Sequence, residues 1–352
     1  MLQWAWAYTL AAAMAMLPAS TGLGFSCKSP SSTTCQAFVG YFPQNTTTAH
    51  NITALFSLYS ASSLFAANSL PASTPSSHSF PSGRPVRVPI ICRCTNGIGI
   101  SDGTPNYTVV KDDTLSLISE TLFSGLLTFP DIAQVNNISD PNRILVGQKL
   151  WIPLPCSCDE VEERRVAHYA HVVVAGSTTD EIVARFGVKK SVLLSLNNIT
   201  DSSLKAGAVL DVPLPACYAT MDDRSMDHNL IVPNGSYALT ANDCVECLCN
   251  STDLRLQCKP FQVTNICPSM SCEVSGLAND LPLGNTLSSS ANSTSTACPS
   301  ATCAYQGYTN ATIFTKLDTS TCSGGPPSFG SIARVVARWW GLLFLTTLFL
   351  LS

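Results

Sequence analysis

One short sequence pattern occurs three times along the chain at nearly constant spacing. Its copies read RVPIICRC up to Cys94, WIPLPCSC up to Cys158 and LDVPLPAC up to Cys217. Each copy joins an apolar, strand-like stretch to a proline and then to a cysteine. Self-similarity at a fixed period is the signature of a repeated structural unit. The chain is therefore expected to contain three copies of one small fold.

The residues before each copy also fall into register. Three threonines each precede an isoleucine by four residues: Thr48/Ile52, Thr114/Ile118 and Thr178/Ile182. An apolar residue later precedes an asparagine by the same interval: Leu64/Asn68, Ile132/Asn136 and Leu193/Asn197. Threonine is a favourable N-cap, and Thr178-x-x-Glu181 matches a capping box. The runs YTVV and HVVV are β-rich, while Leu115, Ile118 and Leu122 have helical spacing. The pattern predicts a β-α-α-β unit of about 45 residues.

The predicted fold class is α+β. Three β-α-α-β units are expected at residues 27–91 (unit 1), 107–153 (unit 2) and 169–214 (unit 3), and unit 1 is the most divergent. Ten of the sixteen cysteines lie from Cys217 onward. The sequence therefore predicts a Cys-rich, loop-dominated region at 217–322, for which the residues indicate no chemical role.

Both ends of the chain have the composition of processing signals. Residues 1–24 hold an uncharged apolar run followed by small residues, which is typical of a signal peptide. A buried N-terminal helix is the alternative. Residues 324–352 end in an apolar run that spans only roughly 20 Å as a helix, against roughly 30 Å for a bilayer core. Small residues, a spacer and a short apolar tail predict GPI attachment at Ser323 or Gly324 with removal of the tail. A tail-inserted or secreted form is the alternative.

The cysteines and the sequons agree with an extracellular chain, and the low charge indicates the kind of partner. Sixteen cysteines, an even number, indicate disulfides rather than zinc ligands or free thiols. Charged residues make up 12% of the chain, the net charge is −4 and no Lys/Arg run exists, so no nucleic-acid partner is expected and a neutral one is favoured. Nine N-x-[ST] sequons predict N-glycosylation at Asn45, Asn51, Asn106, Asn137, Asn198, Asn234, Asn250, Asn292 and Asn310.

The repeated unit has the LysM pattern. Three such units joined by Cys-x-Cys linkers, with a signal peptide, a GPI-type tail and no kinase, resemble the plant LysM domain-containing GPI-anchored proteins, relatives of the chitin elicitor-binding protein. The sequence alone leaves the pairing of the first six cysteines open. The resemblance implies the disulfides Cys27–Cys94, Cys35–Cys158 and Cys92–Cys156.

The resemblance also implies a function. LysM units bind chains of β-1,4-linked N-acetylglucosamine, so the expected ligands are chitin or peptidoglycan fragments. The expected protein is a non-enzymatic pattern-recognition receptor of innate immunity that signals through a partner LysM receptor kinase. It would lie at the extracellular face of the plasma membrane, held by its GPI lipid only. A ligand long enough to reach two copies would link them into a homo-oligomer. No cofactor and no metal are expected.

In the plant receptors the middle unit is the best-attested binder, which places the expected glycan contacts on two loops of unit 2. The first loop consists of Lys111, Asp112, Asp113, Thr114, Leu115, Ser116 and Leu117. The second consists of Ser139, Asp140, Pro141, Asn142, Arg143, Ile144 and Leu145. Helix capping alone also explains Asp113 and Thr114, and a place in the core explains Leu115. Trp151 is expected in the core rather than against sugar, and the scattered histidines are not expected to bind metal.

Two other functions are compatible with a LysM-bearing chain. A wall hydrolase needs two carboxylates held about 5–10 Å apart on a rigid scaffold, and the acids of 217–322 form no glycosidase motif. A secreted or anchored scavenger that hides chitin fragments is the other alternative. The fate of the C-terminal tail discriminates between this scavenger and the anchored receptor. Release from cells by a phosphatidylinositol-specific phospholipase would indicate the anchored receptor.

Overall fold

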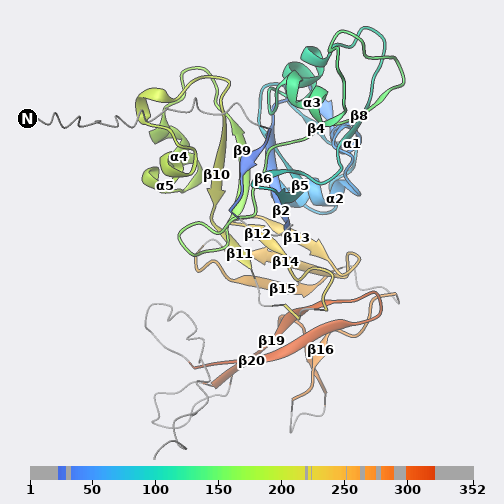
Figure 1. Ribbon diagram of the computed structural model, residues 1–352. Coiled ribbons are helices and arrows are strands. Elements are labelled where there is room, and N and C mark those ends of the chain that lie inside the picture. Colours follow the sequence, from blue (N-terminus) through green and yellow to red (C-terminus); the bar gives the residue numbers. More distant parts are fainter. Residues whose placement is uncertain are drawn as a thin grey trace, which may run out of the picture.

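The computed structural model describes residues 23–28, 33–218, 221–222, 224–250, 252–261, 266–274, 279–288 and 299–321 (Figure 1). The predicted GPI site, the C-terminal tail, the sequon at Asn292 and all but the end of the predicted signal peptide lie outside these residues. Within the part of the chain that is described, no helix combines the length and the apolarity that a membrane span requires.

Each repeat folds as a strand, two helical segments and a closing strand, so the predicted α+β class is confirmed. Unit 1 contains β2 (Thr33–Tyr41), β3 (Thr47–Thr48), α1 (Ala49–Leu55), α2 (Ala61–Ala67), β4 (Ser79–Phe80) and β5 (Val86–Thr95). Unit 2 contains β7 (Asn106–Thr108), the π-helix η1 (Leu117–Leu122), α3 (Phe129–Val135) and β8 (Lys149–Trp151). Unit 3 contains β9 (Ala167–Val172), α4 (Thr179–Phe186), α5 (Lys190–Leu196), the 3₁₀ turn η2 (Asp201–Ser203) and β10 (Val209–Leu214).

The repeated threonines cap the first helical segment of each unit. Thr48 Oγ1 accepts a hydrogen bond from the Asn51 N–H at 3.3 Å, and Thr114 Oγ1 accepts one from the Leu117 N–H at 3.1 Å. Thr178 and Glu181 form the predicted capping box. Each cap satisfies a backbone donor that the helix itself leaves free, which explains why the three threonines superpose.

A repeated asparagine ties the second helix of each unit to its closing strand. In unit 2 the Asn136 side-chain amide donates to the Trp151 carbonyl oxygen at 2.8 Å, and the Trp151 N–H donates to Asn136 Oδ1 at 2.9 Å. The same two hydrogen bonds join Asn68 to Arg87 and Asn197 to Asp211. Backbone groups that leave water need such partners, so the asparagines of the sequence pattern hold the unit closed.

Units 1 and 2 share one hydrophobic core. Ser124 of unit 2 also reaches the backbone of Phe42 in unit 1: its Oγ accepts from the Phe42 N–H at 3.1 Å and donates to the Phe42 carbonyl at 2.8 Å. Successive ring centroids lie 5.2, 5.5 and 6.4 Å apart along a chain of Tyr41, Phe56, Phe123 and Tyr107. Disulfides are therefore not the only contacts that fix these two units.

Unit 3 joins unit 1 through the backbone. The strands β1 (Phe25–Ser26) and β6 (Ile98–Ser101) complete a six-stranded sheet of order β1-β6-β5-β2-β9-β10. Within it β2 pairs in parallel with β9, with Phe38 opposite Tyr169 and Val39 opposite Ala170. Figure 1 shows unit 3 beside units 1 and 2 at one end of the molecule. This pairing makes the three units one body.

The first six cysteines form three disulfides: Cys27–Cys94, Cys35–Cys158 and Cys92–Cys156. They are the same pairs that the family resemblance implies. Cys92–Cys156 connects the closing strand of unit 1 to the end of unit 2, and Cys35–Cys158 connects β2 to the segment that leads to unit 3. Each such bond contributes roughly 2–4 kcal/mol by restricting the unfolded chain.

The Cys-rich region consists of short strands and loops, apart from one long hairpin. Its strands are β11 (Ala216–Tyr218), β12 (Ile231–Pro233), β13 (Tyr237–Thr240), β14 (Val245–Cys249), β15 (Leu256–Pro260), β16 (Ser271–Cys272), β17 (Leu281–Pro282), β18 (Thr286–Ser288), β19 (Pro299–Tyr308) and β20 (Ile313–Thr321). The disulfides within its described residues are Cys217–Cys249, Cys244–Cys267, Cys247–Cys258 and Cys272–Cys303.

The Cys-rich region docks on unit 1. The Tyr237 hydroxyl donates to the Leu70 carbonyl oxygen at 2.6 Å, and Ser69 Oγ donates to the Gly235 carbonyl oxygen at 2.8 Å. Helix α2 lies against β13 at this contact. The region is therefore attached to the three units at a defined place, and the β19–β20 hairpin lies at the opposite end of the molecule in Figure 1.

Candidate functional site

Strands β7 and β8 bring the two predicted loops of unit 2 to one place. The Val109 N–H donates to the Gln148 carbonyl oxygen at 2.9 Å, and the Gly147 N–H donates to the Val109 carbonyl oxygen at 2.8 Å. Gly147 has φ +84°, a conformation that favours glycine. Residues 110–117 and 139–147 therefore leave the strand pair side by side, and together they are called the unit 2 loop pair.

Most of the predicted site residues are accessible, and one is not. Of the predicted residues, those that are exposed are Lys111, Asp112, Thr114, Leu117, Ser139, Asn142, Arg143 and Leu145. Those that are half-buried are Asp113, Ser116, Asp140, Pro141 and Ile144. Leu115 is only 1% exposed and packs in the core shared by units 1 and 2. The Leu115 side chain therefore packs in the core, which is the alternative role given for this residue in the sequence analysis.

The loop pair presents large apolar side chains to solvent. Leu145 and Val146 are 72% and 71% exposed, Val110 is 54% exposed and Leu117 is 41% exposed. Val110 and Val146 lie just outside the predicted loop bounds, so the sequence analysis missed them. Exposed apolar side chains that cluster beside polar groups indicate a contact surface more often than isolated ones do.

The other two units carry different side chains at the equivalent positions. The same turn recurs in them, because the Gly83 N–H donates to the Pro43 carbonyl oxygen at 2.9 Å and the Gly207 N–H donates to that of Val173 at 2.8 Å. Counting from these glycines, the positions of Val110, Leu145 and Val146 are occupied by Gln44, Pro81 and Ser82 in unit 1 and by Val174, Lys205 and Ala206 in unit 3. Unit 2 therefore has the most apolar loop pair.

Two of the three acidic residues of the loop pair, Asp113 and Asp140, make contacts within the loops. Asp113 Oδ2 accepts hydrogen bonds from the Tyr107 hydroxyl at 2.8 Å and from the Val110 N–H at 2.7 Å. Burial, and then Asp113, raise the pKa of Tyr107 to about 12. Asp140 pairs with Arg143 at 3.1 Å on an exposed surface. These contacts fix the loop backbone and leave little net charge for a ligand.

Several backbone donors of the loop pair stay available, and two of them lie beside its exposed apolar side chains. Among the described residues, the N–H groups of Asp112 and Val146 donate to no protein acceptor. Asp112 has φ +71°, a left-handed conformation that turns the chain at this place. Amide donors beside exposed apolar side chains are the groups that an N-acetyl substituent, with its carbonyl oxygen and its methyl, can contact together.

His168 and Asp211 form a buried pair that the sequence analysis did not find. The two residues are 43 positions apart and meet only because β9 pairs with β10. His168 Nδ1 lies 2.8 and 2.9 Å from the Asp211 carboxylate oxygens, and Nε2 lies 2.7 Å from the Asp159 carbonyl oxygen. Both ring nitrogens face acceptors, so both carry protons and the ring is an imidazolium.

Other residues that could suggest chemistry have structural roles. Trp151 is half-buried in β8, and its Nε1 is buried with no partner in the described chain. Burial, followed by Arg185, lowers the pKa of His171 to about 4, so this ring is neutral. The Sγ atoms of Cys35, Cys92 and Cys158 lie within 4.8 Å of one another. All three belong to disulfides, whose sulfurs are not the thiolates that bind metal.

Two acids of the Cys-rich region are engaged by neighbouring groups. Arg224 hydrogen-bonds to Asp222 and lowers its pKa to about 2. Asp227 Oδ2 accepts from Thr240 Oγ1 at 2.7 Å and from the Tyr305 hydroxyl at 2.9 Å. A glycosidase acid must carry a proton at working pH, and Asp222 is ionised.

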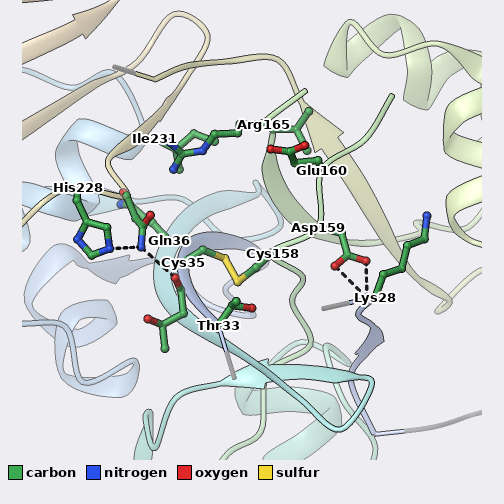
Figure 2. Close-up of a pocket in the computed structure, with 13 residues that line it drawn as sticks. Lys28, Thr33, Cys35, Gln36, Cys158, Asp159, Glu160, Arg165, His228 and Ile231 are labelled. Atoms are coloured by element: carbon green, nitrogen blue, oxygen red, sulfur yellow. Dashed lines mark hydrogen bonds between the residues drawn. A yellow bond between two sulfur atoms is a disulfide. The ribbon is translucent and has the colours of Figure 1, made fainter. Parts of the chain in front are cut away.

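Two cavities lie away from the loop pair. One of 620 Å³ lies between unit 1, the segment that links units 2 and 3, and the Cys-rich region, beside the Cys35–Cys158 disulfide (Figure 2). The other, of 940 Å³, lies within the Cys-rich region between β15 and β19. Neither includes a residue of the unit 2 loop pair.

Comparison with known proteins agrees with this architecture. The model of the LysM domain family matches residues 107–153 and 171–213. The chain is 40% identical over 325 residues to the chitin elicitor-binding protein of Oryza sativa subsp. japonica, covering 90% of this chain and 88% of that protein. It is 41% identical over 316 residues to LysM domain-containing GPI-anchored protein 2 of Arabidopsis thaliana, covering 87% and 85%.

A more distant relative carries a kinase in its name. Chitin elicitor receptor kinase 1 of Physcomitrium patens is 25% identical over 142 residues, which cover 40% of this chain and 22% of that protein. The similarity to the two longer matches extends from the LysM units through most of the Cys-rich region. The chain therefore belongs to the LysM domain-containing GPI-anchored proteins, which are held at the extracellular face of the plasma membrane.

Proposed function

We propose that the chain is a non-enzymatic cell-surface receptor that binds polymers of N-acetylglucosamine through the unit 2 loop pair. The observation that carries this proposal is the juxtaposition there of exposed Leu145 and Val146 with free backbone N–H groups. The name of the rice relative states that it binds a chitin elicitor. Chitin and peptidoglycan fragments are the two ligands that share this sugar.

The chemistry of the loop pair suits a neutral, acetylated sugar. The acetamido carbonyl would accept from a loop N–H, and the acetamido methyl would contact Leu145 or Val146. Sugars exchange good hydrogen bonds with water for those of the protein, so a single site binds weakly. The loop pair carries two basic and three acidic side chains, and Asp140 is paired with Arg143, so its formal charge is only −1 and does not favour an ionic ligand.

A binding function is preferred over catalysis because two carboxyl groups of the Cys-rich region, those of Asp222 and Asp227, are already engaged by neighbouring side chains. Asp222 is held ionised by Arg224, and Asp227 is occupied by Thr240 and Tyr305. A wall hydrolase needs one carboxyl group that keeps its proton and faces the sugar. These two acids of the Cys-rich region do not meet that requirement.

Signalling requires a second protein. A lipid anchor reaches no further than the outer leaflet, so a ligand signal must pass to a membrane-spanning partner. The partner proposed is a LysM receptor kinase that binds the same polymer, and the role proposed is in innate immunity. The similarity to chitin elicitor receptor kinase 1 supports a shared type of ligand-binding ectodomain.

Processing of the chain is proposed on the sequence signals. Maturation would remove the signal peptide at 1–24 and the C-terminal tail and would attach the GPI lipid at Ser323 or Gly324. The domain bounds given above are part of the same proposal. Eight of the nine sequons lie in described residues, and Asn137, at the end of α3, is exposed and near the loop pair in sequence. Peptide mapping of the mature protein identifies these positions.

The proposed function is tested by incubating the purified ectodomain with insoluble chitin and with peptidoglycan. We expect retention on at least one of the two polymers and no release of soluble sugar. Insoluble cellulose, which has the same linkage but no acetamido group, is the control. Failure to bind either amino-sugar polymer contradicts the receptor, and soluble sugar in the supernatant contradicts its non-enzymatic character.

Ligand length should govern affinity. An octamer of N-acetylglucosamine can occupy two ectodomains at once, whereas a tetramer is expected to occupy one. The second contact then forms at a high effective concentration, and we expect the octamer to bind at least about tenfold more tightly and to double the molecular mass. Titration calorimetry and light scattering measure the two quantities. Equal affinity for both oligomers, with a monomer throughout, would exclude polymer-induced association.

A further inference from the structure

The cavity between unit 1, the segment that links units 2 and 3, and the Cys-rich region has a disulfide in its wall. It measures 620 Å³ and its lining includes Thr34, Cys35, Cys158, Arg165 and His228. Figure 2 shows the Cys35–Cys158 bond at its centre, with Asp159 and Lys28 on one side and His228 on the other. A cavity of this size is in the range that holds a small peptide or a drug-sized molecule.

This disulfide differs from its neighbours in access to solvent. Both Cys35 and Cys158 are half-buried. In each of the other six disulfides that the described residues contain, at least one cysteine is buried. Attack by an external thiolate depends on access to a sulfur atom, and Cys35–Cys158 is the one described disulfide in which neither cysteine is buried.

A second disulfide lies next to the first. Cys35 of β2 stands directly opposite Cys92 of β5 in the antiparallel register. The Sγ atoms of Cys35, Cys92 and Cys158 all lie within 4.8 Å of one another, although Cys92 is bonded to Cys156. Cys92 and Cys156 are 0% and 1% exposed, so an external thiol cannot reach them directly. An internal thiolate at Cys35 can.

We propose that Cys35–Cys158 is a thiol-exchange site for a low-molecular-weight thiol, and that Cys92 receives the exchange. The external thiolate forms a bond to Cys158 Sγ, the Cys35–Cys158 bond breaks, and Cys35 leaves as a thiolate with the electron pair. Cys35 then bonds to Cys92 Sγ, the Cys92–Cys156 bond breaks, and Cys156 leaves as a thiolate. A second external thiol releases Cys158 and carries away the first thiol as its own disulfide.

The product has one disulfide fewer than the starting protein and a new cross-strand bond. Cys35–Cys92 lies entirely within unit 1, since it joins β2 to β5. Both covalent connections of unit 1 to the segment Cys156–Cys158 are lost, while Cys27–Cys94 remains. Exchange at this site therefore removes both disulfides between unit 1 and the end of unit 2, which then stay joined by the shared core and by hydrogen bonds such as those of Ser124 with Phe42.

The test uses the intact ectodomain and reduced glutathione as the probe, under native conditions. Free thiols are trapped with iodoacetamide at successive times, and peptide mass spectrometry identifies the alkylated cysteines and the remaining disulfides. We expect label at Cys156 and Cys158 first, at least about tenfold faster than at any other described cysteine pair. We also expect a peptide pair linked through Cys35–Cys92. Earlier reduction of another described disulfide, or uniform reduction of all of them, overturns the proposal.

Two variants test the two steps of the proposal separately: entry of the external thiol through the cavity, and transfer of the exchange from Cys35 to Cys92. The double substitution Cys92→Ser, Cys156→Ser removes the relay, and label should then appear at Cys35 and Cys158. Thr34→Trp places a large side chain at the cavity wall on the exposed side of β2, and it should slow the first labelling at least about fivefold. Unchanged kinetics in the Thr34→Trp protein would show that the thiol does not enter through this cavity. The wild-type labelling order remains decisive if either variant fails to fold.

Discussion

Replacing His168 with leucine is expected to lower the free energy of unfolding of unit 3 by about 3–5 kcal/mol. The substitution leaves the Asp211 carboxylate, whose side chain is 5% exposed, without the imidazolium that lies 2.8 Å away. It also removes the donor that meets the Asp159 carbonyl oxygen at 2.7 Å. A buried charge without its partner is among the most destabilising local changes in a protein. Denaturant titration with a probe in unit 3 measures the loss.

The double substitution His168→Leu, Asp211→Leu is the matched control. It removes both charges and fills the space with apolar groups, so most of the stability should return. His50→Gln, at an exposed position on α1, should change little. A double variant as unstable as the single one would show that the side chains act through packing and not through their pairing.

The His168–Asp211 pair also makes the free energy of unfolding depend on pH. Burial alone would lower the pKa of His168, but Asp211, and to a smaller extent Asp159, outweigh it and raise the pKa above its usual range. The contribution of a group whose pKa is raised by folding is complete below the unfolded pKa of about 6.5 and is lost as the pH rises through the folded pKa. The stability gap between wild type and His168→Leu should therefore narrow as the solution becomes alkaline. A constant gap across that range would contradict the charged pair.

Replacing Leu145 and Val146 together with aspartate is expected to weaken binding of an N-acetylglucosamine octamer about 30-fold. Each substitution removes apolar contact area and adds a carboxylate that must lose water, which together cost about 2 kcal/mol. Because the two side chains are 72% and 71% exposed in the free protein, the fold should be retained. Titration calorimetry measures the affinity, and circular dichroism checks the fold.

The other two units provide matched controls for this experiment. Pro81→Asp with Ser82→Asp changes the equivalent positions of unit 1, and Lys205→Asp with Ala206→Asp changes those of unit 3. We expect each pair to alter the affinity by less than about twofold. A loss of binding in either control that equals the loss in unit 2 would show that unit 2 is not the principal site.

Local repeats made the units predictable from sequence, and distant pairing made their assembly unpredictable. The threonine caps and the order β-α-α-β follow from residues a few positions apart, whereas the asparagines recur in the sequence but their bonds to the closing strand, 14 to 19 residues away, were not predicted. The parallel pairing of Phe38 with Tyr169 joins segments more than a hundred residues apart, and no local pattern indicates it. The aromatic contact of Phe56 with Phe123 was hidden for the same reason, since each residue alone fits the core of its own unit.

The two loops of the candidate site were predicted from the family resemblance, and the structure places them side by side. The repeat pattern fixed the bounds of unit 2, and the resemblance to plant receptors placed the two loops within it. Val110 and Val146 were missed because a valine beside a strand is expected to pack inward, whereas here the turn at Gly147 leaves Val146 in solvent. Alignment of the turn glycines among the three repeats would have indicated them, because only unit 2 has large apolar residues on both sides of the turn.

The central claim is that the unit 2 loop pair contacts the N-acetylglucosamine polymer, and amide chemical shifts of the ectodomain, titrated with the octamer, test it most directly. We expect the largest shifts at Asp112, Val146 and their neighbours, because their N–H groups gain an acceptor that the free protein lacks. Cello-octaose, which lacks the acetamido group, should leave these signals unchanged. Shifts that concentrate in the loops of unit 1 or unit 3, or around the cavity at Cys35–Cys158, with none in 110–117 and 139–147, would contradict the claim.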